Sequence, residues 1–174
     1  MNTMVSFADI EARIDEIAVA DAEPTDPIST YRSLAGELLA LGETVLERWI
    51  VARGVAPTTD VREGFRLLAL HRQGAKGDPS FNACRETCRE LVYHYNLLTL
   101  EPEHPDTTRR LRLAALVAKH LCLFVSGKMQ VEGLGEFCCA AEPIRANDEM
   151  EIAIETSPKG RGAVKLVHVR PAER

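Results

Sequence analysis

Apolar residues recur every three or four positions through most of the first 126 residues of the chain. This spacing puts apolar side chains on one face of an α-helix, whereas a half-buried strand requires strict alternation. The longest such stripe comprises Tyr31, Leu34, Leu38, Leu41, Val45, Trp49 and Ala52. It predicts a helix of about 27 residues, or roughly 40 Å, which Asp26-Pro27 opens and Gly54 closes. A helix this long in a small domain indicates the spine of a bundle or one side of a dimer contact.

Four further segments carry the same periodicity and predict helices. They are residues 6–17, 60–73, 79–99 and 105–125. Ser6 and Asp9 have the spacing of a capping box at the start of segment 6–17. Asp60 and Glu63 have the same spacing at the start of segment 60–73. The last segment contains LRLAALVAKHLCLFV, which is apolar nearly all round. We therefore expect it to be buried on most sides, as the central helix.

After Gly127 the pattern changes from helical spacing to strand spacing. GEFCCAAEPI is a short apolar run, and EMEIAIETSPKGRGAVKLVHVR alternates apolar and polar residues around a turn with Pro and Gly. The sequence thus predicts a mainly α fold, with a five-helix bundle in residues 1–127 and a small C-terminal antiparallel β element in residues 128–174. Because an isolated two-stranded hairpin is marginal in water, we expect this element to pack on the bundle or at a homodimer interface.

The overall charge of the chain restricts its partners. The net charge is −5 and the isoelectric point is about 5.6, whereas nucleic acids and anionic membranes are bound through positive faces. The N-terminus is acidic and lacks the basic start and apolar middle of a signal peptide, and the longest apolar run is too short to cross a bilayer. The cysteine count is five, an odd number. Together these features predict a cytoplasmic protein with free thiols.

Two cysteines four residues apart, in CRETC, form the first candidate site. The apolar positions of the helix predicted over residues 79–99 step alternately by three and four, and they are Phe81, Cys84, Cys88, Leu91, Tyr95 and Leu98. Both thiols fall on this seam, and cysteine packs like a small hydrophobic residue. The favoured interpretation is therefore that Cys84 and Cys88 fill the core and hold no cofactor.

A metal site is the alternative interpretation of the same thiols. A short loop joins the helices predicted at 79–99 and 105–125, so we expect them to be antiparallel and Cys84 to lie level with His120. Thiolates and imidazoles are the ligands of structural zinc, and His71 or His94 is then a candidate to complete the set Cys84, Cys88 and His120. A redox pair of Cys84 and Cys88 is a third interpretation, since residues one helical turn apart lie within disulfide range.

Two weaker candidates lie near the C-terminus. Cys138 and Cys139 are adjacent in a predicted strand and so point to opposite faces, which exposes one thiol to redox modification or cross-linking. A strand with small residues is the favoured interpretation. Lys159 and Arg161 belong to the Gly-containing turn SPKGRGAVK, which we interpret as a solvated turn and, as the alternative, as an interaction site for phosphate groups.

Three arginines crowd the start of the helix predicted at 105–125, namely Arg109, Arg110 and Arg112. Cations at this end of a helix oppose its dipole, so we expect carboxylates to offset them. Glu101, Asp106 or the acidic surface of a partner could do so. These arginines are therefore candidate interaction residues.

The chain contains none of the common catalytic motifs, such as GxSxG, HExxH or GxGxxG after a strand. The sequence therefore predicts a non-enzymatic protein that acts through protein–protein contacts, as a regulator, adaptor or assembly factor. The alternative is a metal, ligand or redox sensor built on Cys84, Cys88 and His120. A nucleic-acid-binding regulator is the second alternative. We also expect a homodimer, with the long second helix and the C-terminal element as its contact surfaces.

Overall fold

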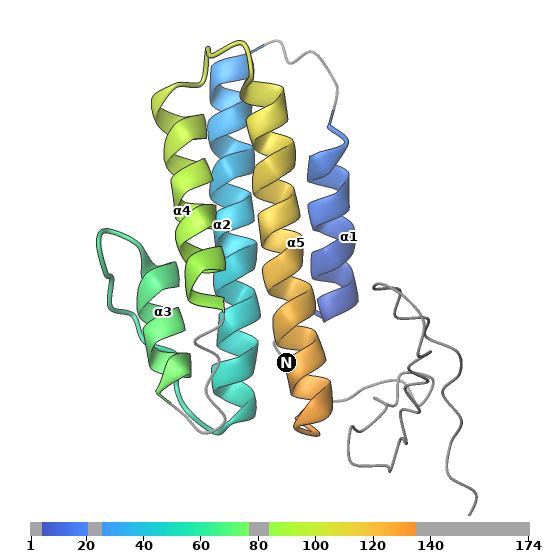
Figure 1. The fold of residues 1–174 in the computed structure, drawn as a ribbon, viewed down its shortest axis with the longest axis vertical. Coiled ribbons are helices and arrows are strands. Elements are labelled where there is room, and N and C mark those ends of the chain that lie inside the picture. The colour runs from blue at the N-terminus through green and yellow to red at the C-terminus, as the bar shows by residue number, and fades with distance from the viewer. Residues whose placement is uncertain (1–4, 21–25, 77–83, 135–174) are drawn as a thin grey trace, which may run out of the picture. The chain divides into compact units, whose positions relative to one another are not determined.

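The computed structural model of the protein describes residues 5–20, 26–76 and 84–134. Within them the chain forms five α-helices, which are α1 (Phe7–Ala18), α2 (Pro27–Ala52), α3 (Arg66–Ala75), α4 (Arg85–Leu100) and α5 (Thr107–Val131). The predicted mainly helical fold is confirmed over these residues (Figure 1). The chain divides into two units after Gly135. The second unit, with the predicted β element, Cys138, Cys139, Lys159 and Arg161, lies outside the described residues.

Side-chain caps begin the first two helices as the sequence predicts. At α1, Ser6 Oγ accepts a hydrogen bond from the backbone N–H of Asp9 at 3.1 Å, and the Asp9 carboxylate accepts one from the N–H of Ser6 at 3.2 Å. At α2, the Asp26 carboxylate accepts from the N–H of Ser29 at 3.2 Å. Gly54 follows the last turn of α2 with a φ of 73°, the left-handed conformation in which glycine ends helices.

α2 is the central helix of the bundle, whereas the apolar pattern of the sequence predicts α5 in that position. It packs against α1, α3, α4 and α5, which run alongside it in Figure 1. Its buried residues extend well beyond one stripe and are Ala35, Leu38, Gly42, Val45, Leu46, Trp49 and Ile50. Between residues 34 and 50 only Ala40 is exposed. α2 therefore has little free surface for the dimer contact that its length predicts.

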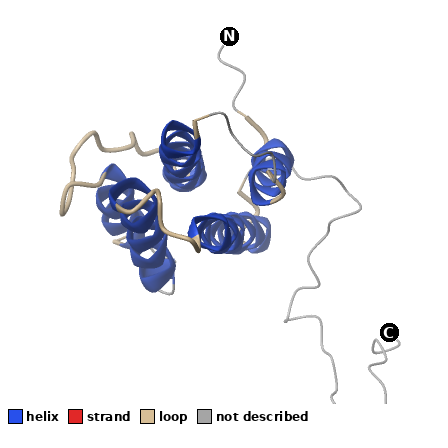
Figure 2. Ribbon diagram, turned by 90° about the horizontal axis from the view of Figure 1, so that it is seen from above, coloured by secondary structure: helices blue, strands red, loops and turns tan. Residues whose placement is uncertain are grey.

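α5 packs against α1, α2 and α4, and the helices seen end-on surround a shared core (Figure 2). The helix begins at Thr107, whose hydroxyl donates to the carbonyl of His104 at 2.6 Å. It runs to Val131, beyond the predicted end at Val125, and passes through Gly127, where the sequence analysis ends the bundle. Only one side of α5 is buried, so the expectation of burial on most sides is wrong.

α3 begins at Arg66, later than predicted, because residues 60–65 contain a tight turn. The backbones of Arg62 and Phe65 exchange hydrogen bonds of 3.0 and 2.9 Å, and between them Glu63 and Gly64 have φ values of 52° and 84°. Positive φ at both central residues is the geometry of a two-residue hairpin turn. The spacing of Asp60 and Glu63 thus belongs to a turn, and the helix cap that it predicts is wrong.

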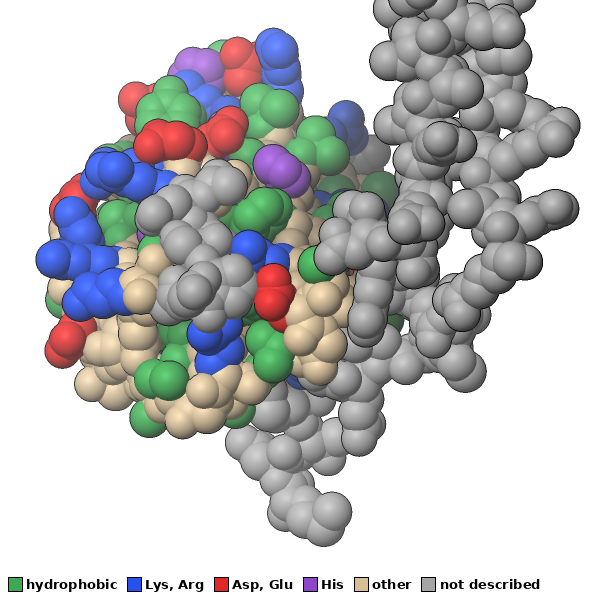
Figure 3. All heavy atoms as spheres, turned by 60° about the horizontal axis from the view of Figure 1, so that its bottom comes forward, with side chains coloured by type: hydrophobic (Ala, Val, Ile, Leu, Met, Phe, Trp, Pro, Cys, Tyr) green, Lys and Arg blue, Asp and Glu red, His purple; other side chains and the backbone are tan. Residues whose placement is uncertain are grey.

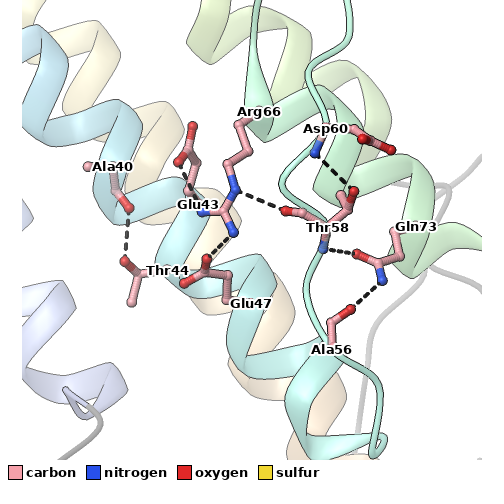
Figure 4. A network of polar contacts seen from close by, with 9 residues as sticks. All are labelled: Ala40, Glu43, Thr44, Glu47, Ala56, Thr58, Asp60, Arg66 and Gln73. Carbon is pink, nitrogen blue, oxygen red and sulfur yellow. Dashed lines mark hydrogen bonds and ion pairs between the residues drawn. The ribbon is translucent and has the colours of Figure 1, made fainter. Parts of the chain in front are cut away.

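Two side chains hold the segment between α2 and α3 in place (Figure 4). Arg66 pairs with Glu47 at 2.6 Å and donates to the carbonyl of Thr58 at 3.0 Å. Gln73 accepts from the N–H of Thr58 at 2.8 Å and donates to the carbonyl of Ala56 at 2.7 Å. These bonds satisfy backbone groups of an irregular segment and tie it to both helices.

α4 begins at Arg85 with Cys84 as its N-cap, and the predicted start of this helix at residue 79 lies outside the described residues. The predicted seam is confirmed within them, since Cys84, Cys88, Leu91 and Leu98 are all buried. Tyr95 is half-buried and packs edge-to-face with Phe65, with ring centroids 5.6 Å apart.

Among the helices described, none has the combination of length and apolar content that crossing a bilayer requires.

Candidate functional site

α5 carries two apolar seams that face in opposite directions. The inner seam comprises Leu111, Ala114, Ala118, Leu121 and Val125, all of which are buried. The outer seam runs two residues later along the helix and comprises Leu113, Leu116, His120, Leu123 and Gly127. Two residues correspond to about 200° around a helix. The core therefore uses the inner seam and leaves the outer one on the opposite side.

The outer seam is exposed although it is mostly apolar. Leu113, Leu116 and Leu123 are 39%, 61% and 49% exposed, and Val131 at the end of the helix is 64% exposed. His120, in the middle of the seam, is also exposed. Single exposed leucines are normal on a protein surface, but a contiguous row marks an interaction site. We refer to Leu113, Leu116, His120, Leu123, Gly127 and Val131 as the α5 outer face.

All the formal charges on α5 itself are positive. The helix contains Arg109, Arg110, Arg112, Lys119 and Lys128 and no Asp or Glu. Lys119 contacts α1, where its Nζ lies 2.8 Å from an oxygen of Asp15 and 3.4 Å from one of Glu11. The hydrogen bond to Asp15 raises the pKa of Lys119, burial opposes this shift, and the interaction with Glu11 adds to it. The α5 outer face is therefore bordered on the α1 side by an ion-paired cation.

The three predicted interaction arginines lie at the first turns of α5, beside the start of the α5 outer face. Arg110 donates to Glu101 at 2.8 Å, and this bond lowers the pKa of Glu101. Glu101 thus offsets one of the three cations, as the sequence analysis expects. Arg109 and Arg112 are exposed, and they remain candidates for contact with an acidic partner.

On the side of the molecule turned forward in Figure 3, the cationic side chains do not form a continuous patch. On the side turned forward in Figure 3, Lys and Arg side chains lie among Asp and Glu side chains. A nucleic-acid-binding face instead presents a continuous basic patch or stripe. Together with the net charge of −5, this mixture gives no support to nucleic acid as the partner.

The second candidate site lies where α3 meets the start of α4. Cys84 is 2% exposed and Cys88 is 0% exposed, and His71 of α3 is also buried. The sulfur of Cys84 interacts with the Cys88 thiol and with the His71 side chain. We refer to Cys84, Cys88 and His71 as the thiol cluster. The predicted burial of both thiols is confirmed, and the structure adds His71 as their neighbour.

The pKa values of the two cysteines in the thiol cluster are shifted in opposite directions. The pKa of Cys84 falls to about 6, because Cys88 donates a hydrogen bond to the Cys84 thiolate and His71 stabilises that thiolate through a hydrogen bond and its charge. Burial opposes this shift. The pKa of Cys88 is raised by the same hydrogen bond, by burial and by the charge on Cys84. The same contact therefore shifts the pKa values of the two thiols in opposite directions, downward at Cys84 and upward at Cys88.

His120 does not join these thiols, contrary to the register expected from the sequence. Leu91 of α4 and Leu121 of α5 approach the same point above Gly42, so these two leucines lie level. Cys84 lies seven residues before Leu91, or about 10 Å along the helix, and His120 points away from the core.

Cys122 lies elsewhere in the core, with its sulfur 3.9 Å from the carbonyl oxygen of Phe7 in α1. Burial raises the pKa of Cys122 to about 11. Within the described parts of the chain, no group of three or more His, Cys, Asp or Glu side chains is placed to hold a metal ion. The three ligands proposed for zinc, Cys84, Cys88 and His120, are thus not brought together by the structure.

Comparison of the chain with protein-family models, with curated proteins and with solved structures finds no match. The fold and the two sites therefore define a class, a helical-bundle protein whose described residues include an exposed apolar helix face and a buried thiol cluster. Its function is inferred from its own residues. Sequence reasoning missed the α5 outer face, but two a/d seams on one helix are a signal that could have identified it.

Proposed function

We propose that the protein is a non-enzymatic interaction protein, a regulator, adaptor or assembly factor, and that the α5 outer face is its partner-binding surface. The observation that carries this proposal is the row of exposed apolar side chains at Leu113, Leu116, Leu123 and Val131. Exposing these apolar side chains to water is unfavourable in free energy, and a partner that covers them removes this penalty.

The spacing of the α5 outer face favours a helix as the partner element. From Leu113 to Gly127 its residues step by three, four, three and four, which is the pattern that packs knobs into the holes of a second helix. Fully burying one leucine contributes about 1.5–3 kcal/mol. The three leucines and Val131 are each only partly exposed, so their burial supplies on the order of a few kcal/mol.

The charge on α5 favours a partner with carboxylates beside its apolar stripe. Arg109 is exposed at the first turn of α5, where cations oppose the helix dipole. An acidic amphipathic helix would offset this charge while its apolar residues cover Leu113 and Leu116. Recognition of an amphipathic helix by an apolar surface is a common binding mode.

A homodimer is the alternative use of the same surface. Pairing α5 with α5 of a second copy covers the apolar row equally well, but it brings together two helices that carry no carboxylate and five cations each, of which Arg110 and Lys119 are ion-paired within the protein. Like charges across an interface disfavour such pairing. A partner protein with an acidic helix is therefore favoured over a second copy.

Site-specific photo-crosslinking in the native host tests the proposal. A photoreactive residue at position 116 should trap one defined protein, which mass spectrometry then identifies. The matched control is position 61, because Val61 is 66% exposed and belongs to the segment before α3 and not to α5. Equal trapping from positions 116 and 61, or none from position 116, would contradict the proposal. A crosslink only to a second copy would favour the homodimer.

A further inference from the structure

We propose that a cavity between α3 and the segment before it binds a small organic phosphate, a molecule that carries one phosphate monoester on a short body. The cavity is open to solvent and has a volume of about 380 Å³, a size found among small-molecule sites. Its lining includes Asp60, Val61, Arg62, Ala69, Arg72 and Lys76. The proposal concerns a different surface from the α5 outer face and is independent of the function proposed for that face.

Positive charge predominates around this cavity. Arg62, Arg72 and Lys76 are the cations of its lining, and Asp60 is the carboxylate. At neutral pH three positive charges and one negative charge leave an excess of two positive charges, which is close to the opposite of the charge on a phosphate monoester. Guanidinium groups bind phosphate oxygens through paired N–H donors. The lining therefore has the charge and the donors that a phosphate group requires.

The two cations that α3 contributes are free to contact a ligand. Arg72 and Lys76 are both exposed and lie four residues apart, at the end of the helix. Within the part of the chain that the structure describes, neither forms an ion pair. Arg66 of the same helix differs, because its guanidinium lies 2.6 Å from Glu47 and 3.6 Å from Glu43. Arg66 thus serves the packing of α3 on α2, whereas Arg72 and Lys76 keep their charge beside the cavity.

The third cation comes from the turn before α3. The Arg62 guanidinium lies 3.6 Å from Glu63, but Glu63 is closer to Arg89 of α4, at 2.9 Å. The dipole of α3 favours cations in its last turn, which explains Arg72 and Lys76 without any ligand. It does not explain Arg62, which precedes the helix. The convergence of cations from two segments on one cavity is the observation that favours an anionic ligand.

Hydrogen bonds fix the wall of the cavity before any ligand binds (Figure 4). Thr58 and Gln73 both belong to the lining, and the N–H of Thr58 donates to Gln73 Oε1 at 2.8 Å. The N–H of Asp60 donates to the Thr58 hydroxyl at 3.1 Å, and Arg66 donates to the Thr58 carbonyl at 3.0 Å. Less conformational entropy is lost when a ligand binds to such a preorganised site.

The apolar part of the lining favours an ester over the free phosphate ion. Val61 is 66% exposed, and Ala69 lies beside it in the lining. Inorganic phosphate contacts the cations alone, whereas the organic body of an ester also covers these apolar side chains and removes their area from water. We therefore expect an organic phosphate to bind more tightly than phosphate itself.

NMR titration of the isotope-labelled, full-length protein with phenyl phosphate tests the proposal. At constant ionic strength, the backbone amide signals of residues 58–62 and 69–76 should shift saturably, with a Kd below about 1 mM. Inorganic phosphate should shift the same signals with a Kd that is several-fold higher. Equal Kd values for the two probes, or small shifts scattered over the surface without saturation, would contradict the proposal.

Charge variants separate this cavity from general attraction of anions. Arg72→Gln should raise the Kd for phenyl phosphate roughly five- to tenfold, because charge-assisted hydrogen bonds are lost, and Arg72→Lys should raise it less. Asp60→Asn should lower the Kd, since it removes a repulsive carboxylate from the lining. The matched control is Arg109→Gln, which removes one exposed cation from the start of α5. The proposal is overturned if Arg109→Gln raises the Kd as much as Arg72→Gln, or if Arg72→Gln leaves it unchanged.

Discussion

Gly42 of α2 lies directly against Leu91 of α4. A Cβ atom built on Gly42 would lie 2.9 Å from Leu91 Cδ2, 3.2 Å from Leu67 Cδ1 and 3.6 Å from Leu121 Cδ2. The three leucines come from α4, α3 and α5, and each is almost completely buried. The missing side chain at position 42 is therefore what allows four helices to converge at one point.

Replacing this glycine should destabilise the bundle although alanine is the better helix former. Gly42→Ala gains about 1 kcal/mol of helix propensity and costs about 1–3 kcal/mol of overpacking. Gly36→Ala, in the same helix, has nothing within 4 Å of its new Cβ and should gain about 0.5–1 kcal/mol. Urea unfolding gives the change in the free energy of unfolding for each variant, and the difference between the two changes is the steric cost at position 42. Equal changes would show that the contact at Gly42 does not constrain the fold.

Glu37 and Glu43, both on α2, should respond to pH with opposite signs. Hydrogen bonds from Arg13 lower the pKa of Glu37, so its stabilising contribution is present above the unfolded pKa near 4.5 and is lost as the pH falls. Burial raises the pKa of Glu43 despite the nearby Arg66, so its ionised form costs stability that returns as the pH falls. Glu37→Gln should therefore destabilise the protein at neutral pH, and Glu43→Gln should stabilise it. Both differences should shrink in acid, as measured by thermal unfolding across the pH range.

The two seams of α5 should differ sharply in their effect on stability. Leu121→Ala, on the inner seam, should lower the free energy of unfolding by about 2–5 kcal/mol, because it opens a cavity in the core. Leu116→Ala, on the α5 outer face, should change it by less than about 0.5 kcal/mol. Chemical denaturation measures both values. A large loss from Leu116→Ala would mean that this side chain serves the fold and not a partner.

The turn before α3 should depend on its glycine. Gly64 has a φ of 84° with open space around it, so Gly64→Ala should cost about 1–2 kcal/mol through backbone strain alone. Glu63 has a φ of 52°, and Glu63→Asn should be tolerated because asparagine adopts this conformation readily. If Gly64→Ala unfolds at the same denaturant concentration as the wild type, the turn geometry is wrong.

Much of the fold could be predicted from the sequence because its local signals agree with its packing. The cap at Ser6, the opening at Asp26 and the seam through Cys88 each depend on residues close in the chain. The start of α3 was missed because Asp60 and Glu63 have the spacing of a cap, while the turn depends on Gly64 and on the pairing of Arg62 with Phe65. The central role of α2 depends on contacts with four other helices, which no single stripe encodes.

The candidate site was harder to predict than the fold, because it depends on which residues the fold leaves uncovered. His120 was placed beside Cys84 by a register estimated from loop length. In the structure Leu91, and not Cys84, is level with the neighbouring Leu121, and His120 itself is exposed on the outer seam of α5. His71 was a candidate only as an additional metal ligand, since nothing in the sequence fixes how α3 meets α4. The α5 outer face went unnoticed because an all-round apolar helix is usually a buried one.

The measurement that tests the central claim most directly is the affinity of the protein trapped from position 116 for three purified forms of the chain. These are the wild type, the variant Leu116→Glu and the variant Val61→Glu. A carboxylate in the middle of an apolar contact should weaken binding by more than about tenfold, or 1.4 kcal/mol, while Val61→Glu should leave the Kd unchanged. Equal affinities for wild type and Leu116→Glu, with both correctly folded, would contradict the assignment of the α5 outer face as the binding surface.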